Sequence, residues 1–150
     1  MTTSTTRPDT PAVRGSAARA LLRPAVGVGI IIGLFGLADT GPFEPASPIT
    51  GLLPLLALAY LLFGFARGAF HQGHGLTRQL VGLVLFGGVA LVVLVVDPAV
   101  GRYLVAAGWL GHAVWDYLHR DGRVVPRWYI EVCIPVDVVV AASLIVAPLL

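Results

Sequence analysis

The middle of the chain contains an uncharged run of 18 residues, QLVGLVLFGGVALVVLVV, from Gln79 to Val96. A helix of this length rises about 27 Å, close to the roughly 30 Å hydrocarbon thickness of a bilayer. Arg78 precedes the run and the pair Asp97-Pro98 follows it, so charge and a turn signal mark its two ends. The run therefore predicts a helix that spans a membrane.

The composition of the whole chain supports this prediction. Only 12% of the 150 residues are charged, 57% are hydrophobic, and the mean hydropathy is +0.85. Soluble domains carry about 25% charged residues, so an ordinary soluble domain is excluded. All ten basic residues are arginine and the net charge is only +2, which gives no indication of a nucleic-acid partner. The single cysteine, Cys133, excludes an internal disulfide framework.

Loops rich in turn-forming and charged residues divide the chain into five predicted transmembrane helices. These spans cover about residues 21–38, 49–66, 79–96, 99–119 and 128–149, and residues 20–150 form one all-α transmembrane bundle. Residues 1–19 are mostly threonine, serine, proline, alanine and arginine, which predicts a disordered cytoplasmic tail.

The first span has an alternative interpretation as a cleaved signal peptide. Arginines precede it, and the sequence GLA that ends at Ala38 resembles a small-x-small cleavage motif. Against cleavage, the next membrane segment follows almost at once, so no secreted domain would remain to be delivered.

The distribution of arginine predicts the orientation of the bundle, because cytoplasmic loops of membrane proteins are enriched in basic residues. Arg102 alone follows the third span. The other nine lie before the first span or in the loops after the second and fourth spans: Arg7, Arg14, Arg19, Arg23, Arg67, Arg78, Arg120, Arg123 and Arg127. We therefore expect a multi-pass protein of the cell inner (cytoplasmic) membrane, with its N-terminus inside and its C-terminus outside.

Polar side chains concentrate in the last two predicted spans. On the fourth, His112, Asp116 and His119 are four and three residues apart, a spacing that places them on one helix face. On the fifth, Cys133 and Asp137 are four residues apart and share a face in the same way.

The register of the predicted hairpin brings these two faces together. Its loop is centred between Val124 and Val125, so an antiparallel arrangement places His112 level with Asp137 inside the membrane. An ionisable side chain at such a depth is costly and is a candidate functional residue.

This hairpin resembles that of a group of small bacterial integral membrane proteins, seen especially in actinobacteria. The shared pattern is His-x-x-Trp-Asp-x-x-His, then Val-Pro-x-x-Tyr, then Cys-x-x-x-Asp. In this chain its residues are His112, Trp115, Asp116, His119, Val125, Pro126, Tyr129, Cys133 and Asp137. The resemblance implies a multi-pass membrane protein and implies no activity. The chain departs from the pattern at Arg120, where a second histidine is common.

Three interpretations of the cluster are open, and they leave undecided whether the protein is an enzyme. In the first, the protein is structural or accessory and its polar groups pair with one another. His112 and Asp137 then bond across the helices, while the helix-internal pairs are Asp116 with Arg120 and Glu131 with Arg127. Its partners would be the lipid bilayer and a membrane protein or a second copy of the chain.

The second interpretation is a metal site, since imidazole and carboxylate groups at one-turn spacing are ligands that zinc or iron accepts. The candidate ligands are His112, Asp116, His119, Cys133 and Asp137. A catalytic version would be a hydrolase acting on a lipid-like substrate, with Asp137 or Glu131 as general base. The third interpretation is a subunit of a transporter, in which His112, Asp116 and Asp137 relay protons or bind substrate.

Overall fold

The computed structural model describes residues 23–37, 43–72, 75–146 and 149. These residues form five α-helices and one short 3-10 helix, and they contain no strand. The elements are α2 (Pro24–Leu37), α3 (Pro48–Ala66), η1 (Ala69–Gln72), α4 (Gly75–Val93), α5 (Pro98–Leu118) and α6 (Arg127–Val146). The all-α prediction is thus confirmed for this part of the chain. The predicted tail at residues 1–19 and the cleavage motif ending at Ala38 lie outside the described residues.

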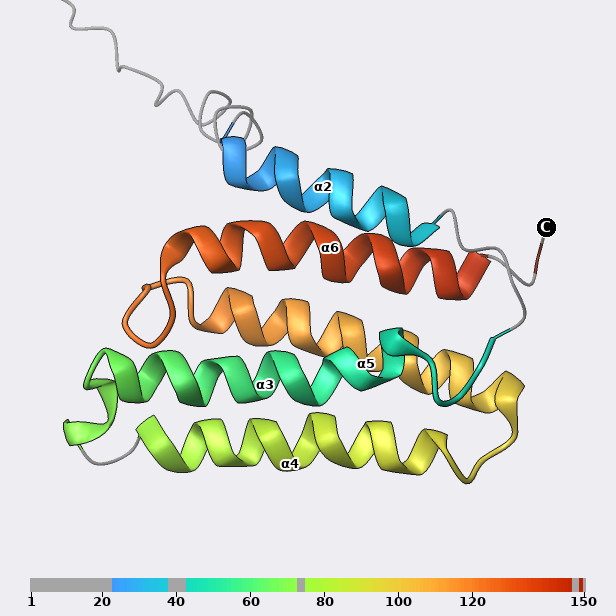
Figure 1. Cartoon of the computed structure of the whole chain (residues 1–150), viewed down its shortest axis with the longest axis horizontal. Coiled ribbons are helices and arrows are strands. Elements are labelled where there is room, and N and C mark those ends of the chain that lie inside the picture. Colours follow the sequence, from blue (N-terminus) through green and yellow to red (C-terminus); the bar gives the residue numbers. More distant parts are fainter. Residues whose placement is uncertain (1–22, 38–42, 73–74, 147–148, 150) are drawn as a thin grey trace, which may run out of the picture.

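The helices run up and down, so that each is antiparallel to the next along the chain (Figure 1). Their order in space differs from their order in sequence. Helix α5 contacts α3, α4 and α6, whereas α2 contacts only α6 among the described elements. Helix α5 is therefore the centre of the bundle, and α2 is attached to it through α6.

The helix ends follow from local sequence. Proline occupies the first position of α2, α3 and α5, where its missing N–H group costs no hydrogen bond. The Asp97 carboxylate accepts a hydrogen bond of 2.8 Å from the backbone N–H of Ala99 and caps α5. Helix α4 begins at Gly75, four residues before the predicted start at Gln79. Arg78 lies just before the uncharged run, but arginine is a good helix former. It is therefore part of the first turn of α4.

Three helices, α3, α4 and α6, are long and apolar enough to cross a membrane. Helix α5 has 21 residues but carries Arg102, His112 and Asp116, and α2 has 14 residues. Large apolar side chains cover the outer surface, such as Val84, Leu91 and Val95, which are 74%, 68% and 83% exposed. Soluble monomers rarely expose extensive apolar surface, so this surface supports a membrane protein.

The loop between α5 and α6 is tight. Gly122 adopts a φ of 72°, a left-handed conformation that residues with a side chain rarely adopt. Its carbonyl oxygen accepts a hydrogen bond of 3.0 Å from Nη2 of Arg67, just after α3. Val125 in the same loop is fully buried. These contacts hold the hairpin closed at the point where the sequence predicts its turn.

Helices α2 and α6 approach closely because two glycines of α2 face α6. A Cβ atom on Gly29 would overlap the backbone carbonyl of Val132, and one on Gly33 would lie 2.8 Å from the Cβ atom of Val139. Small residues at such positions let helix backbones approach and gain packing contacts within a membrane.

We predict that Gly29→Ala lowers the free energy of unfolding by about 1–3 kcal/mol, because the added methyl group would overlap a backbone carbonyl of α6 rather than a flexible side chain. Reversible denaturation in mixed detergent micelles measures this loss. Gly27→Ala is the matched control, since a Cβ atom on Gly27 meets nothing within 4 Å. Equal stability of the two variants would contradict the close contact at Gly29.

Candidate functional site

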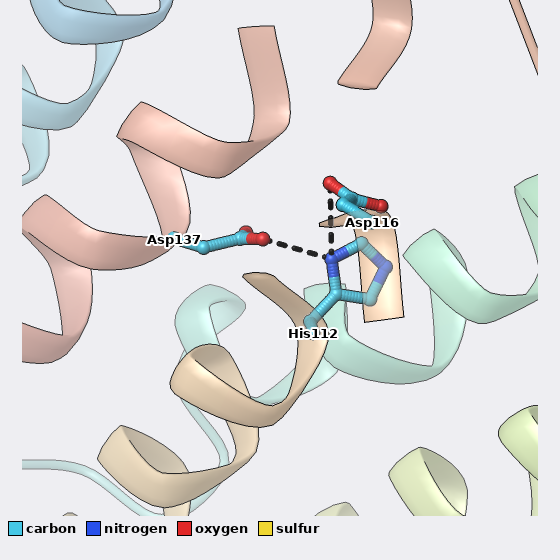
Figure 2. Close-up of side chains that lie close together, drawn as sticks. All are labelled: His112, Asp116 and Asp137. Atoms are coloured by element: carbon cyan, nitrogen blue, oxygen red, sulfur yellow. Dashed lines mark hydrogen bonds and ion pairs between the residues drawn. The ribbon is translucent and has the colours of Figure 1, made fainter. Parts of the chain in front are cut away.

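Three ionisable side chains meet in the interior of the bundle, at the junction of α5 and α6 (Figure 2). The Nδ1 atom of His112 lies 2.9 Å from Oδ2 of Asp137 and 3.8 Å from Oδ2 of Asp116. All three residues are 0% exposed. We call His112, Asp116 and Asp137 the polar cluster. The predicted level pairing of His112 with Asp137 is confirmed by their hydrogen bond.

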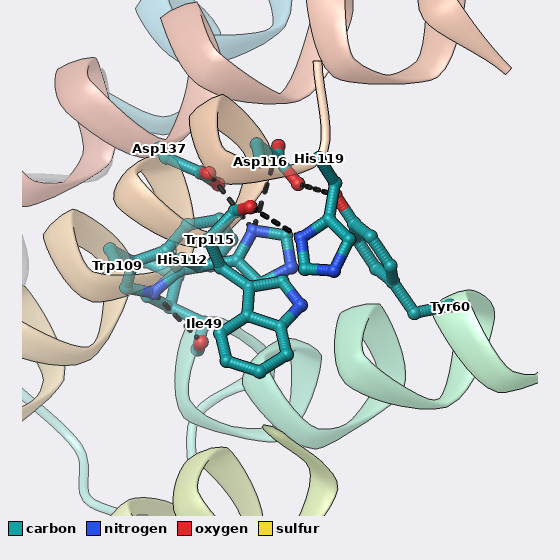
Figure 3. Close-up of polar contacts among 8 residues, drawn as sticks. All are labelled: Ile49, Tyr60, Trp109, His112, Trp115, Asp116, His119 and Asp137. Carbon is teal, nitrogen blue, oxygen red and sulfur yellow. Dashed lines mark hydrogen bonds and ion pairs between the residues drawn. The ribbon is translucent and has the colours of Figure 1, made fainter. Parts of the chain in front are cut away.

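Helix α3 contributes a residue that sequence reasoning missed. The hydroxyl of Tyr60 donates a hydrogen bond of 2.5 Å to Oδ1 of Asp116, and Tyr60 is fully buried (Figure 3). The ring of Tyr60 also meets His112 edge-on, with centroids 6.0 Å apart, and Phe86 meets it from α4 at 5.3 Å. The sequence did contain a signal for this contact, a tyrosine within an otherwise apolar span, because a buried hydroxyl needs a hydrogen-bond partner.

Each member of the polar cluster keeps one polar atom without a hydrogen-bond partner among the described residues. These atoms are Nε2 of His112, Oδ2 of Asp116 and Oδ1 of Asp137. A buried polar atom without a partner typically costs about 1–3 kcal/mol, more when it is charged. The cluster therefore has unused capacity for a ligand.

The charge of the cluster is not balanced by the described residues. The only ion-pair partner of Asp116 or Asp137 among them is His112. With a neutral imidazole, the two carboxylates carry a charge of −2, which one divalent cation or two protons would neutralise. Burial of unpaired charge is costly, so a bound cation or added protons would stabilise the two carboxylates.

The donor set fits a transition-metal ion. One imidazole and two carboxylates are common ligands of zinc and iron. Two atoms bonded to one such ion at about 2.1 Å lie about 3.0–3.4 Å apart, for bond angles between octahedral and tetrahedral. The distances of 2.9 and 3.8 Å from Nδ1 of His112 bracket that range. The hydrogen bond of Nδ1 to Asp137 and the edge-on contacts of the Tyr60 and Phe86 rings position the imidazole, and Nε2 has no hydrogen-bond partner among the described residues.

His119, a candidate ligand from the sequence, lies outside the polar cluster (Figure 3). Its Nδ1 atom donates a hydrogen bond of 2.8 Å to the carbonyl oxygen of Trp115. Its Nε2 atom therefore accepts a hydrogen bond of 2.9 Å from the side-chain amide of Gln79. Both ring nitrogens are used, so His119 joins α5 to α4. Sequence reasoning missed Gln79, which it assigned only to the start of a span.

Two other candidates also lie apart from the polar cluster. Cys133 is buried on α6 but is not among the converging ligand atoms. Glu131 forms an ion pair with Arg23 at the start of α2. The predicted pair of Glu131 with Arg127 is therefore wrong, because α2 packs against this face of α6.

The predicted pair of Asp116 with Arg120 is wrong as well. Asp116 points into the bundle and accepts a hydrogen bond from Tyr60. Arg120 instead donates a hydrogen bond of 3.0 Å to the carbonyl oxygen of Tyr117. The two residues are four apart, but the helix ends at Leu118, so Arg120 lies in the loop and does not continue the helical face.

The polar cluster is buried away from the molecular surface, since all three of its residues are 0% exposed. Two surface pockets are described, one beside Arg23 and Glu131 and one beside Thr50 and Gly87, and none of the three cluster residues lines either. Structural metal sites are closed in this way, while catalytic sites keep an open position for water or substrate.

Comparisons with protein-family models, with curated proteins and with solved structures found no match for this chain. The resemblance of its hairpin to small bacterial membrane proteins stays a prediction. The geometry of the polar cluster is therefore the basis for the functional proposal.

We predict that His112→Leu and Asp137→Leu each lower the free energy of unfolding by about 1–3 kcal/mol, since each leaves a buried polar partner unpaired. The double variant should lose less free energy of unfolding than the sum of the two single variants, because it contains neither His112 without Asp137 nor Asp137 without His112. Denaturation in mixed micelles measures all four forms. As a control, His112→Leu combined with Val138→Ala should be additive, because Val138 faces outward at 46% exposure. Additive losses for the first pair would mean that the two residues are not coupled.

Proposed function

We propose that the protein is a five-span protein of the cell inner membrane that binds one divalent transition-metal ion, zinc or iron, in its polar cluster. The observation that carries the proposal is the meeting of three fully buried ionisable side chains whose charges are not balanced by arginine. Oδ2 of Asp116, which lies 3.8 Å from Nδ1 of His112 and has no hydrogen-bond partner among the described residues, adds capacity to bind an ion.

In this proposal the ion has a structural role, and the protein is a structural or accessory component of the membrane. Asp137 belongs to α6, whereas His112 and Asp116 belong to α5, so a shared ion would join the two helices. Tyr60 donates to Asp116 and orients its carboxylate, the task of an outer-shell residue in metal sites. The full burial of the cluster favours a structural ion over a lipid hydrolase, whose metal would need an open position for water or substrate. Glu131, one of the two predicted general bases, is paired with Arg23 instead.

The orientation with the N-terminus in the cytoplasm is supported by the arginines at the helix ends. Arg67, Arg78, Arg120, Arg123 and Arg127 lie where α3 and α5 end and where α4 and α6 begin, which is one end of the bundle (Figure 1). Arg102 is near the start of α5, at the other end. This asymmetry is the one that the positive-inside rule associates with the cytoplasmic side.

We predict that a topology reporter fused after Leu150 is active only outside the cytoplasm, because five spans and a cytoplasmic N-terminus place the two ends on opposite sides. The same reporter inserted at Gly122, in the loop between α5 and α6, should report the cytoplasm and serves as the control. A cytoplasmic location of the reporter after Leu150, with the N-terminus also in the cytoplasm, would exclude an odd number of spans.

We predict that the protein purified in detergent and supplied with zinc or iron retains about one equivalent of metal. Asp137→Asn and His112→Ala should lose it, since each removes a ligand from the cluster. Elemental analysis measures the metal. His71→Ala and Asp97→Asn are matched controls that change an exposed histidine and an exposed carboxylate elsewhere. Retention of metal by both cluster variants would exclude this site.

A proton relay is the second candidate, favoured by the order of the polar contacts. Tyr60 donates to Asp116, Asp116 lies 3.8 Å from His112, and His112 bonds Asp137. Protons rather than a metal would then neutralise the carboxylates. The metal analysis separates the two candidates, because a proton-binding cluster would hold no stoichiometric metal in the wild-type protein.

A further inference from the structure

A basic cavity opens at the same end of the bundle as most of the arginines. It has a volume of about 670 Å³ and lies between the start of α2, the end of α5 and the start of α6. Three arginines line it: Arg23, Arg120 and Arg127. None of the polar-cluster residues does, so this cavity is a separate feature of the molecule.

The acidic side chains at the cavity are already paired. Glu131 forms its ion pair with Arg23, and Asp121 lies 3.4 Å from Nε of Arg123, which is outside the lining. Arg120 and Arg127 have no carboxylate within ion-pair distance among the described residues. The cavity therefore offers two arginines to an anion.

One of these arginines is held in place at the rim. The guanidinium of Arg120 stacks over the Tyr117 ring at 4.2 Å and donates one hydrogen bond to the Tyr117 carbonyl oxygen. A guanidinium has five N–H groups in a planar fork that matches the oxygens of a phosphate. Most of its donors thus remain for a ligand.

The other wall of the cavity is apolar and extends along α6. Leu118 at the end of α5, 62% exposed, and Ile134 of α6 line it, and Ile134 lies about 10 Å from Arg127 along the helix. Tyr117 and Trp128, exposed by 56% and 57%, flank this end, where aromatic side chains mark a membrane interface. A ligand with a charged head and an apolar tail fits this combination better than a free anion.

We propose that this cavity binds an anionic phospholipid, with its phosphate at Arg120 and Arg127 and an acyl chain along Leu118 and Ile134. Basic pockets between transmembrane helices on the cytoplasmic side bind such headgroups in other membrane proteins. A volume of about 670 Å³ is within the range of small-molecule sites and admits a glycerophosphate headgroup.

The test measures the thermal unfolding midpoint of the full chain in neutral detergent, titrated with phosphatidylglycerol, phosphatidylcholine or inorganic phosphate. We expect a saturable rise with phosphatidylglycerol only. Its half-saturating concentration should increase about fivefold in Arg120→Gln and in Arg127→Gln, because each arginine contributes roughly 1 kcal/mol of attraction. Arg123→Gln, in the same loop but outside the lining, should leave the titration unchanged.

Three results would overturn the proposal. Equal stabilisation by phosphatidylcholine would remove the role of charge, and stabilisation by inorganic phosphate alone would replace the lipid with a free anion. If Arg123→Gln increased the half-saturating concentration of phosphatidylglycerol as much as Arg120→Gln and Arg127→Gln do, the lipid would be attracted by surface charge in general and not by this cavity. The Arg127 side chain packs beside Gly122, so Arg127→Lys keeps the apolar stem if the glutamine variant does not fold, and it should still weaken binding by losing the planar fork.

Discussion

The bond between His112 and Asp137 joins the two helices to which the rest of the bundle is attached. Helix α5 is in contact with α3, α4 and α6, and α6 carries α2. Because the bond lies in a fully buried region, where water cannot replace it, a shift of either helix by one residue would leave charged groups unpaired. The register of the hairpin, and with it the position of Arg120, Arg123 and Arg127 at its closed end, depends on this pairing.

The contribution of a polar contact to stability depends on how deeply the contact is buried. The ion pair of Arg123 with Asp121 has side chains 85% and 51% exposed, and such pairs contribute about 0–1 kcal/mol. Removal of one partner from a buried pair costs about 3–5 kcal/mol in soluble proteins. The interior contacts of α5 therefore determine the arrangement of the helices, while the charges at the bundle end remain available for binding.

The sequence predicts the helices and the pairing of the hairpin, because both depend on short-range patterns. Apolar runs give the helices, and a short loop fixes the level of His112 against Asp137. The contributions of Tyr60 and Gln79 could not be derived in this way. Both come from helices distant in sequence from the hairpin, and no periodicity states which face of α3 or α4 is turned toward α5.

The pairing of Glu131 illustrates the same limit. Spacing along one helix favours Arg127, but the close approach of α2 brings Arg23 to Glu131 instead. Gly29 and Gly33 make that approach possible, and they are visible in the sequence as two small residues four apart. Which helix they face is decided by the three-dimensional arrangement.

The attachment of α2 to α6 alone has a consequence for biosynthesis. The ribosome makes α2 before any other described helix and α6 after all of them. Until α6 is made, the glycine face of α2 has no helix to pack against among the described elements, and the bundle closes only when the last helix arrives. A chain interrupted before α6 would leave α2 without its packing surface, which makes the final helix a checkpoint for the completed protein.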